Sequence, residues 1–196
     1  MANIIKENAR GFDCIAPEDL LLTSRKVFLT GEVNSKSCDE LLKSLMVLNE
    51  ADPDKEIELY INSNGGCVSS GLLVYDYIKT MKAPLKTICC GTAASMGAIL
   101  FLSAPKREMF CHSRLLLHDP SYGSKDIGGK KPLELQKEID VLMEVREELA
   151  SIIAEITGKP IKQIYEITKD DTFFCADEAL KLKLATSIIG KKGKRK

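Results

Sequence analysis

Residues 85–97 read Leu-Lys-Thr-Ile-Cys-Cys-Gly-Thr-Ala-Ala-Ser-Met-Gly. The stretch begins as an apolar strand that runs to Gly91, and an apolar helix from Ala98 to Ala104 follows it. This pattern predicts that Ser95 lies at a tight turn between strand and helix. There a serine side chain projects outward, and the helix N-terminus favours negative charge. Serine is also a common helix N-cap, so the stretch alone leaves a structural role for Ser95 open.

The composition bounds the kind of protein. Of the 196 residues, 29% are charged and 44% are hydrophobic, which is an ordinary mixture for one globular domain. Lys plus Arg and Asp plus Glu each number 28, so no overall charge attracts nucleic acid or an anionic membrane. No apolar run approaches the roughly 20 residues of a membrane-spanning helix, and we expect no secretory signal. The seven cysteines lie mostly in apolar segments, which predicts buried thiols in a cytoplasmic protein.

Predicted strands alternate with predicted helices, which is typical of an α/β fold with a parallel sheet. The predicted strands are residues 26–33, 56–62, 85–91, 109–111, 115–118 and 185–189. The predicted helices are residues 37–51, 68–81, 98–104, 133–157, a short one from Pro160, and 176–183. Lys106-Arg107-Glu108 and residues 63–66 are expected to be turns. The helix over 133–157 spans ~38 Å, so we expect part of it to project and pack on another subunit.

Two further features of the sequence converge on Ser95. A glycine pair ending at Gly66 follows the second predicted strand, and functional sites of open α/β sheets gather at the carboxyl ends of strands. The backbone N–H groups of Gly66 and Met96 are therefore candidates for an oxyanion hole, with a plain turn as the alternative for Gly66. His118 ends an apolar strand on the same rim. It is better placed for a general base than His112, the other histidine, although a lone histidine is often structural.

A histidine base also needs a carboxylate that orients its imidazole. The chain has 28 Asp and Glu residues, and spacing does not choose among them. Asp170 and Asp171 are attractive, because the apolar pair Phe173–Phe174 would anchor their loop to the core. The residues by themselves leave this assignment open.

A metal site is an alternative use for the cysteines. The candidate ligands would be Cys89, Cys90, Cys111 and His112. Adjacent cysteines on a strand face opposite sides, and the chain contains no C-x-x-C spacing. Buried thiols are favoured, and we expect no metal.

Three blocks of sequence carry a resemblance to a known family. They are Gly91-Thr-Ala-Ala-Ser-Met-Gly-Ala98, Leu59-Tyr-Ile-Asn-Ser-Asn-Gly-Gly66 and Arg114-Leu-Leu-Leu-His-Asp-Pro120. Together they resemble the motifs of the Clp protease proteolytic subunit (ClpP, peptidase S14 type), and the similarity runs from about Gly11 to Ile189. The resemblance implies a single crotonase-like α/β domain, with a head from which a helical handle protrudes. The implied parts are an N-terminal arm (1–24), the head (25–118 and 158–189), the handle loop and helix (119–157) and a basic tail (190–196).

Carried over position by position, the resemblance implies a serine endopeptidase. Ser95 would be the nucleophile, His118 the general base and Asp171 the acid that orients the imidazole. The backbone N–H groups of Gly66 and Met96 would form the oxyanion hole. No cofactor is implied, because ATP is used by a partner chaperone and the chain has no P-loop.

The resemblance also implies partners. Members of the family form two stacked heptameric rings, a tetradecamer, around an enclosed chamber. An AAA+ unfoldase of the ClpX, ClpA or ClpC type feeds unfolded polypeptides into that chamber. We therefore expect a homo-oligomer in the cytoplasm that serves protein quality control, with neither nucleic acid nor membrane as a partner.

Several positions depart from the family pattern. Asn64 replaces a proline, and Asp119 replaces a glutamine, which places a carboxylate where it is expected to raise the pKa of the neighbouring imidazole or compete for it. The pair Lys169–Asp170 replaces Glu-Arg, and that arginine helps to join the two rings in the family. Glu58 and His112 stand where apolar residues commonly line the chaperone-docking cleft.

These departures suggest a divergent paralogue and leave two alternatives open. The chain either acts as a peptidase or serves as a catalytically weak structural or regulatory ring subunit. In both cases it is open to assembly with a second, more typical ClpP. An acyl-CoA enzyme of the crotonase fold is disfavoured, because such enzymes usually lack a Ser-His-Asp set.

Overall fold

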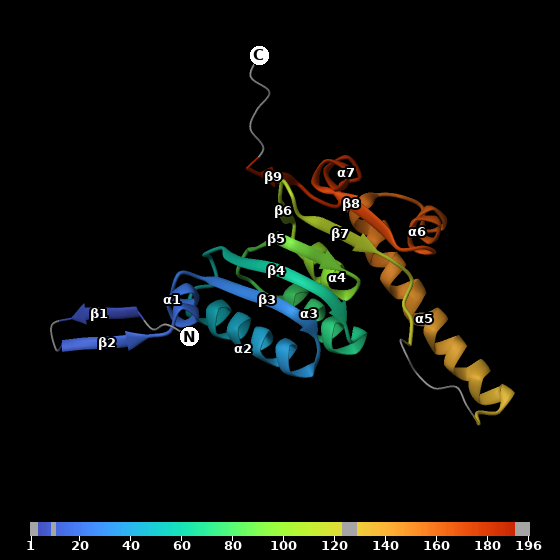
Figure 1. The fold of residues 1–196 in the computed structure, drawn as a ribbon, viewed down its shortest axis with the longest axis horizontal. Helices are drawn as coiled ribbons and strands as arrows, with labels where there is room; N and C mark the ends of the chain where they lie inside the picture. The colour runs from blue at the N-terminus through green and yellow to red at the C-terminus, as the bar shows by residue number, and fades with distance from the viewer. Residues whose placement is uncertain (1–3, 9–10, 123–128, 191–196) are drawn as a thin grey trace, which may run out of the picture.

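The computed structural model describes residues 4–8, 11–122 and 129–190 (Figure 1). The strands are β1 (Ile4–Asn8), β2 (Gly11–Ile15), β3 (Lys26–Val33), β4 (Ile57–Gly66), β5 (Leu85–Ala94), β6 (Lys106–Phe110), β7 (Arg114–Leu117), β8 (Thr172–Cys175) and β9 (Ser187–Ile189). The helices are α1 (Pro17–Thr23), α2 (Ser35–Ala51), α3 (Val68–Thr80), α4 (Met96–Leu102), α5 (Pro132–Thr157), α6 (Ile161–Thr168) and α7 (Ala176–Lys181).

The main sheet contains seven strands. Its central path is β3-β4-β5-β6-β9, and all of these neighbours are parallel. The late part of β5 pairs with β7, also in parallel, and β7 pairs with β8 in the antiparallel direction. The predicted α/β fold with a mainly parallel sheet is confirmed. Because β4, β5 and β7 run in parallel, their carboxyl ends meet at one edge of the sheet.

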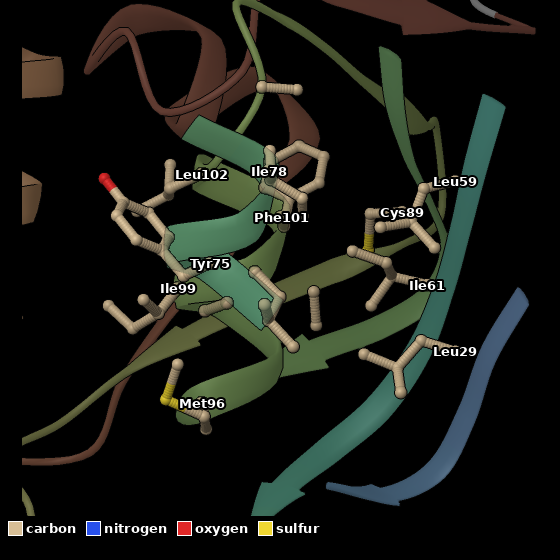
Figure 2. Packing of buried hydrophobic residues seen from close by; sticks show 14 of the residues in the cluster. Leu29, Leu59, Ile61, Tyr75, Ile78, Cys89, Met96, Ile99, Phe101 and Leu102 are labelled. Carbon is tan, nitrogen blue, oxygen red and sulfur yellow. The ribbon is translucent and has the colours of Figure 1, made fainter. Parts of the chain in front are cut away.

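One face of the sheet holds the core. Along β4 the side chains of Ile57, Leu59 and Ile61 are fully buried and alternate with partly exposed ones, as a strand covered on one face requires. Helices α2, α3 and α4 pack side by side on this covered face (Figure 1). Every residue of α4 is buried, which explains why this helix carries no polar side chain. Figure 2 shows Phe101 and Met96 of α4 within this core.

Helix α5 begins one residue from the predicted start and ends at the predicted residue. Its first part projects from the body (Figure 1), where Leu133, Ile139 and Met143 are exposed. Its last part packs on the core through residues such as Leu149 and Ile153.

The N-terminal residues are more regular than expected. We expected residues 1–24 to be an N-terminal arm, and the described part of this arm contains two strands and a helix. Strands β1 and β2 form an antiparallel hairpin that extends away from the body, and α1 packs against β3 (Figure 1). Helix α1 begins with Pro17 in its first turn and carries Glu18 and Asp19 there, all of which favour a helix start. The basic tail from residue 191 lies outside the described residues.

Two strands replace predicted turns or loops. Strand β6 begins at Lys106, where Lys106-Arg107-Glu108 was expected to turn the chain. A charged triplet belongs to this strand because Arg107 points into the core and donates hydrogen bonds to four backbone carbonyls, those of Ala104, Pro105, Lys183 and Leu184. Burial lowers the pKa of this guanidinium. Strand β8 was missed, and of its two phenylalanines Phe174 is buried while Phe173 is 61% exposed.

Candidate active site

Ser95 connects β5 to α4 with a backbone conformation that is rare for any residue but glycine. Its φ is 53° and its ψ is −125°, which costs of order 1–3 kcal/mol. The surrounding backbone holds it there, because its N–H donates to the Leu116 carbonyl (3.0 Å) and its carbonyl accepts from Ala98 N–H (2.9 Å). Ser95 occupies the N-cap position, but its side chain makes no capping hydrogen bond. The capping interpretation therefore does not account for the serine hydroxyl.

The end of β4 lies directly against this turn. A Cβ atom added to Gly65 would sit 2.6 Å from both the Ala94 carbonyl oxygen and the Ser95 Cβ. A Cβ atom on Gly66 would sit 2.2 Å from the Val33 carbonyl oxygen. Both glycines also have positive φ angles, 90° and 146°. Residues 63–66 continue β4 as extended chain, so the predicted free turn is wrong. Glycine is needed here for close approach.

A pocket of about 850 Å³ opens at this edge of the sheet. Four of the five predicted site residues line it, namely Gly66, Ser95, Met96 and His118. Much of the remaining wall comes from α5. These helical residues are Val141, Leu142, Val145, Arg146, Leu149, Ala150 and Ile153. The structure thus brings Ser95 and His118 to one largely apolar cavity, as expected from their places at strand ends.

His118 directly follows β7 and is half-buried. Within the described part of the chain, neither its imidazole nor the Ser95 hydroxyl makes a hydrogen bond. Catalytic hydrogen bonds are often long or poorly aligned without substrate, so this geometry does not remove either residue as a candidate.

Asp171 is exposed. It is not one of the described residues that line the pocket. Its position relative to His118 follows from strand pairing. In the antiparallel β7–β8 ladder Leu117 pairs with Thr172, so the next position sets Asp171 opposite His118. The catalytic roles assigned to these residues stay predictions.

The carboxylate of Asp119 makes its hydrogen bonds to α5 and α6. One oxygen accepts a hydrogen bond from Arg146 Nε of α5 at 2.6 Å, and the other accepts from Thr168 Oγ1 of α6 at 2.6 Å. Asp119 is therefore held by α5 and α6, and the expected competition for the imidazole is not what its contacts show.

Sequence reasoning missed Cys67 as a pocket residue. Its exposed thiol lines the pocket at the N-cap of α3, 3.3 Å from both Ser69 Oγ and Ser70 Oγ. Hydrogen bonds from these two serines lower its pKa from the ordinary 9.0 to about 7. The expectation that the cysteines are buried is wrong for Cys67 and for Cys14, which is also exposed. The sequence signal was its place directly after the glycine pair.

The described residues contain neither a metal site nor a membrane span. No group of three or more His, Cys, Asp and Glu side chains is arranged to hold a metal ion. No helix among these residues is long and apolar enough to cross a bilayer.

A comparison with protein families is consistent with this geometry. The family model described as Clp protease matches residues 9–192 of the chain. The matched range includes all the residues that line the pocket, the long helix α5 and the β7–β8 pair. It also identifies the α/β architecture as the ClpP type. The chain belongs to the Clp protease family.

Proposed function

We propose that the protein is a serine endopeptidase subunit of a Clp-type, ATP-dependent protease. Members of this family are in general serine peptidases. The observation that carries the proposal is the strained backbone of Ser95 in a pocket that also contains His118. Strain of this kind is retained where it exposes a reacting group, as at the nucleophile turn of other hydrolases.

In the proposed reaction Ser95 Oγ attacks the carbonyl carbon of a peptide bond. His118 removes the hydroxyl proton and then donates it to the leaving amine. Asp171, directly before strand β8, orients the imidazole and stabilises its charged form. The N–H groups of Gly66 and Met96 would donate to the oxyanion, a contribution that typically amounts to about 3 kcal/mol per donor. Water then releases the acyl group from Ser95.

The proposed substrates are unfolded polypeptides. A largely apolar pocket accepts apolar side chains, and a chamber restricts access by size rather than by sequence. Clp proteases in general assemble as rings with chaperone partners. We propose two stacked heptameric rings in the cytoplasm, fed by an AAA+ unfoldase that supplies the ATP hydrolysis. The subunit itself would need no cofactor.

A second candidate is a catalytically weak ring subunit that works with a second ClpP. One observation favours it. The uncovered face of β4 and β5 carries an ion-pair network in which Lys86 Nζ lies 2.7 Å from Glu58 and 3.8 Å from Glu108. The family commonly uses apolar residues in this region for chaperone docking. A charged face would suit a subunit that leaves docking to a partner chain.

The Ser95→Ala variant tests the leading proposal. It should lower the hydrolysis of fluorogenic peptides by about 10³-fold or more and leave the mass of the oligomer unchanged. Ser44→Ala, which removes an exposed hydroxyl on α2, is the matched control and should keep full activity. Residual turnover above roughly one hundredth of the parent would contradict a nucleophile at this position.

Labelling of the serine separates the two candidates. A fluorophosphonate should label Ser95 in the assembled protein if the chain is a peptidase. Absence of labelling, both alone and after mixing with a second ClpP, would instead support the structural subunit.

A further inference from the structure

Asp119, the residue after His118, is joined to two helices by short hydrogen bonds. Its carboxylate accepts from Arg146 Nε and from Thr168 Oγ1, each at 2.6 Å. Its backbone N–H donates to the Thr168 carbonyl oxygen, also at 2.6 Å. Three bonds therefore fix both the main chain and the side chain of Asp119 to residues outside its own strand.

Arg146 is held on its second side as well. Its guanidinium carbon lies 4.0 Å from the centre of the Tyr165 ring, a cation–π contact between α5 and α6. The side chains of Arg146 and Asp119 are 22% and 29% exposed, so water weakens their ion pair only in part. Asp119, Arg146 and Thr168 all line the same pocket as Ser95. We call these three residues, together with Tyr165, the 119–146 clamp.

The backbone is fixed on both sides of His118, and the 119–146 clamp fixes one of these sides. On the N-terminal side the β7–β8 ladder fixes Leu117 through its pairing with Thr172. On the C-terminal side the clamp fixes Asp119. His118 therefore lies between a fixed strand and a fixed residue, and a shift of α5 that carries Arg146 would move the second anchor. A displacement of about 1 Å at a catalytic group lowers rates by about 10²-fold.

We propose that Asp119 and Arg146 are positioning residues that hold His118 in register with Ser95. The proposal rests on the proposed peptidase function. It deepens that function by making the orientation of α5 a determinant of catalytic geometry within one subunit. The carboxylate acts through the backbone it fixes, not by contact with the substrate.

A purely structural role makes a different prediction. Partly exposed ion pairs contribute little to global stability, so a clamp that served stability alone would have small effects everywhere. A positioning role concentrates the effect in the chemical step. The two roles are therefore separated by kcat against KM, and by the rate at which Ser95 reacts.

The test uses Asp119→Asn, Arg146→Gln and the double variant in the full-length, assembled protein. Asparagine keeps the size of the side chain, and its amide oxygen still accepts from Thr168. Its amide nitrogen takes the place of the oxygen that accepted from Arg146, so the change removes both the charge and the hydrogen bond to Arg146. We expect each single change to lower kcat and the rate of fluorophosphonate labelling about tenfold, with KM changed less than about twofold. The double variant should be no slower than either single one, because both break the same link. Arg146→Lys should recover part of the lost kcat.

Glu166→Gln is the matched control. It removes one carboxylate from an exposed ion pair with Lys169 on α6, outside the pocket, and should leave kcat unchanged. If Asp119→Asn fails to assemble, Thr168→Val takes its place, since it removes the hydroxyl that donates to Asp119 and keeps the shape of the side chain. It should lower kcat while the thermal midpoint shifts little.

Three results would overturn the proposal. They are an unchanged kcat in Asp119→Asn or Thr168→Val, additive losses in the double variant, or a rise in KM without a fall in kcat. Ser95→Ala, measured in parallel, separates this failure from failure of the proposed function. If Ser95→Ala is inactive while the clamp variants are fully active, the peptidase assignment stands and the clamp does not. If Ser95→Ala stays active, the peptidase assignment itself is lost.

Discussion

The thiol of Cys67 lies in the same pocket as Ser95 and is exposed to solvent. Hydrogen bonds from Ser69 and Ser70 lower its pKa to about 7. The thiolate is the form that reacts with alkylating reagents, so Cys67 is reactive near neutral pH. An unshifted thiol would be almost entirely protonated under the same conditions.

We expect the rate of alkylation of Cys67 by iodoacetamide to reach half of its maximum near pH 7. Thiolate forms above the pKa, so the rate at pH 8 should exceed that at pH 6 by about tenfold. Mass spectrometry of the peptide that contains Cys67 measures it, and Cys67→Ser shows any background label. Ser70→Ala removes one stabilising hydrogen bond and should move the half-maximum upward. A half-maximum near pH 9 in the parent protein would contradict the shift.

For single residues, the sequence predicted where a side chain lies in the fold better than it predicted how reactive that side chain is. Ser95, His118 and Gly66 were found because each ends a strand, and parallel strands bring their ends together. The apolar pair Phe173–Phe174 made Asp170 and Asp171 attractive, but only the resemblance chose Asp171, since no local pattern distinguishes one carboxylate among many. Cys67 was missed because cysteine usage along the chain indicates burial on average, while its reactivity depends on two neighbouring hydroxyls.

The junction between elements at the active site depends on the absence of a side chain. The end of β4 touches the β5–α4 turn at Gly65, with a positive φ and no room for a methyl group. This contact fixes how far the oxyanion-hole candidate Gly66 lies from Ser95. The distance between two predicted site residues is thus set by packing of elements.

Gly65→Ala should therefore damage both stability and catalysis. A Cβ 2.6 Å from the Ala94 oxygen must push the two elements apart, which costs about 3 kcal/mol and slows labelling of Ser95 by fluorophosphonate. Urea unfolding measures the first effect. Gly158→Ala is the control, because Gly158 also has a positive φ (70°) but has no atom within 4 Å of its added Cβ. It should cost about 1 kcal/mol and leave labelling unchanged. Equal losses in both variants would argue against a packing effect.

Elements with strong hydrophobic periodicity were predicted within a few residues, α2, α3 and α5 among them. The start of strand β6 was predicted as a turn because its charged triplet includes Arg107, whose side chain is buried and whose charge is stabilised by carbonyls from distant segments. Strand β8 was missed because it has only four residues, and which of them are buried depends on its pairing with β7. The β1–β2 hairpin contains apolar residues, but neither strand alternates apolar and polar positions throughout, so its pairing left little trace in the sequence.

For the whole molecule, the projecting part of α5 offers a surface that the isolated chain leaves exposed. Ile139 and Met143 are each 52% exposed, and they lie one helical turn apart on the same face. Exposed apolar side chains on a projecting helix suit contact with another subunit. In a two-ring assembly of the family type, α5 would lie between the rings.

In the proposed two-ring assembly, Ile139→Glu combined with Met143→Glu should separate the rings. Placing two charges in an apolar contact costs several kcal/mol per copy, and the cost is repeated in every subunit. Mass photometry should show a species of half the parent mass, with lower peptidase activity. Gln136→Glu adds a negative charge to the same helix at an already polar position and should keep the parent mass. An unchanged mass in the double variant would show that this face of α5 is not the contact between rings.

The backbone of Ser95 also bears on how such a chain changes by descent. A glycine at this position would relieve a strain of about 1–3 kcal/mol and delete the nucleophile in the same mutation. For a duplicated gene released from selection for hydrolysis, loss of the nucleophile is therefore favoured by stability as well as by drift. A serine that persists here does so although glycine would make the folded state more stable. In a lineage that turns toward a purely architectural subunit, this codon is where the change should be recorded first.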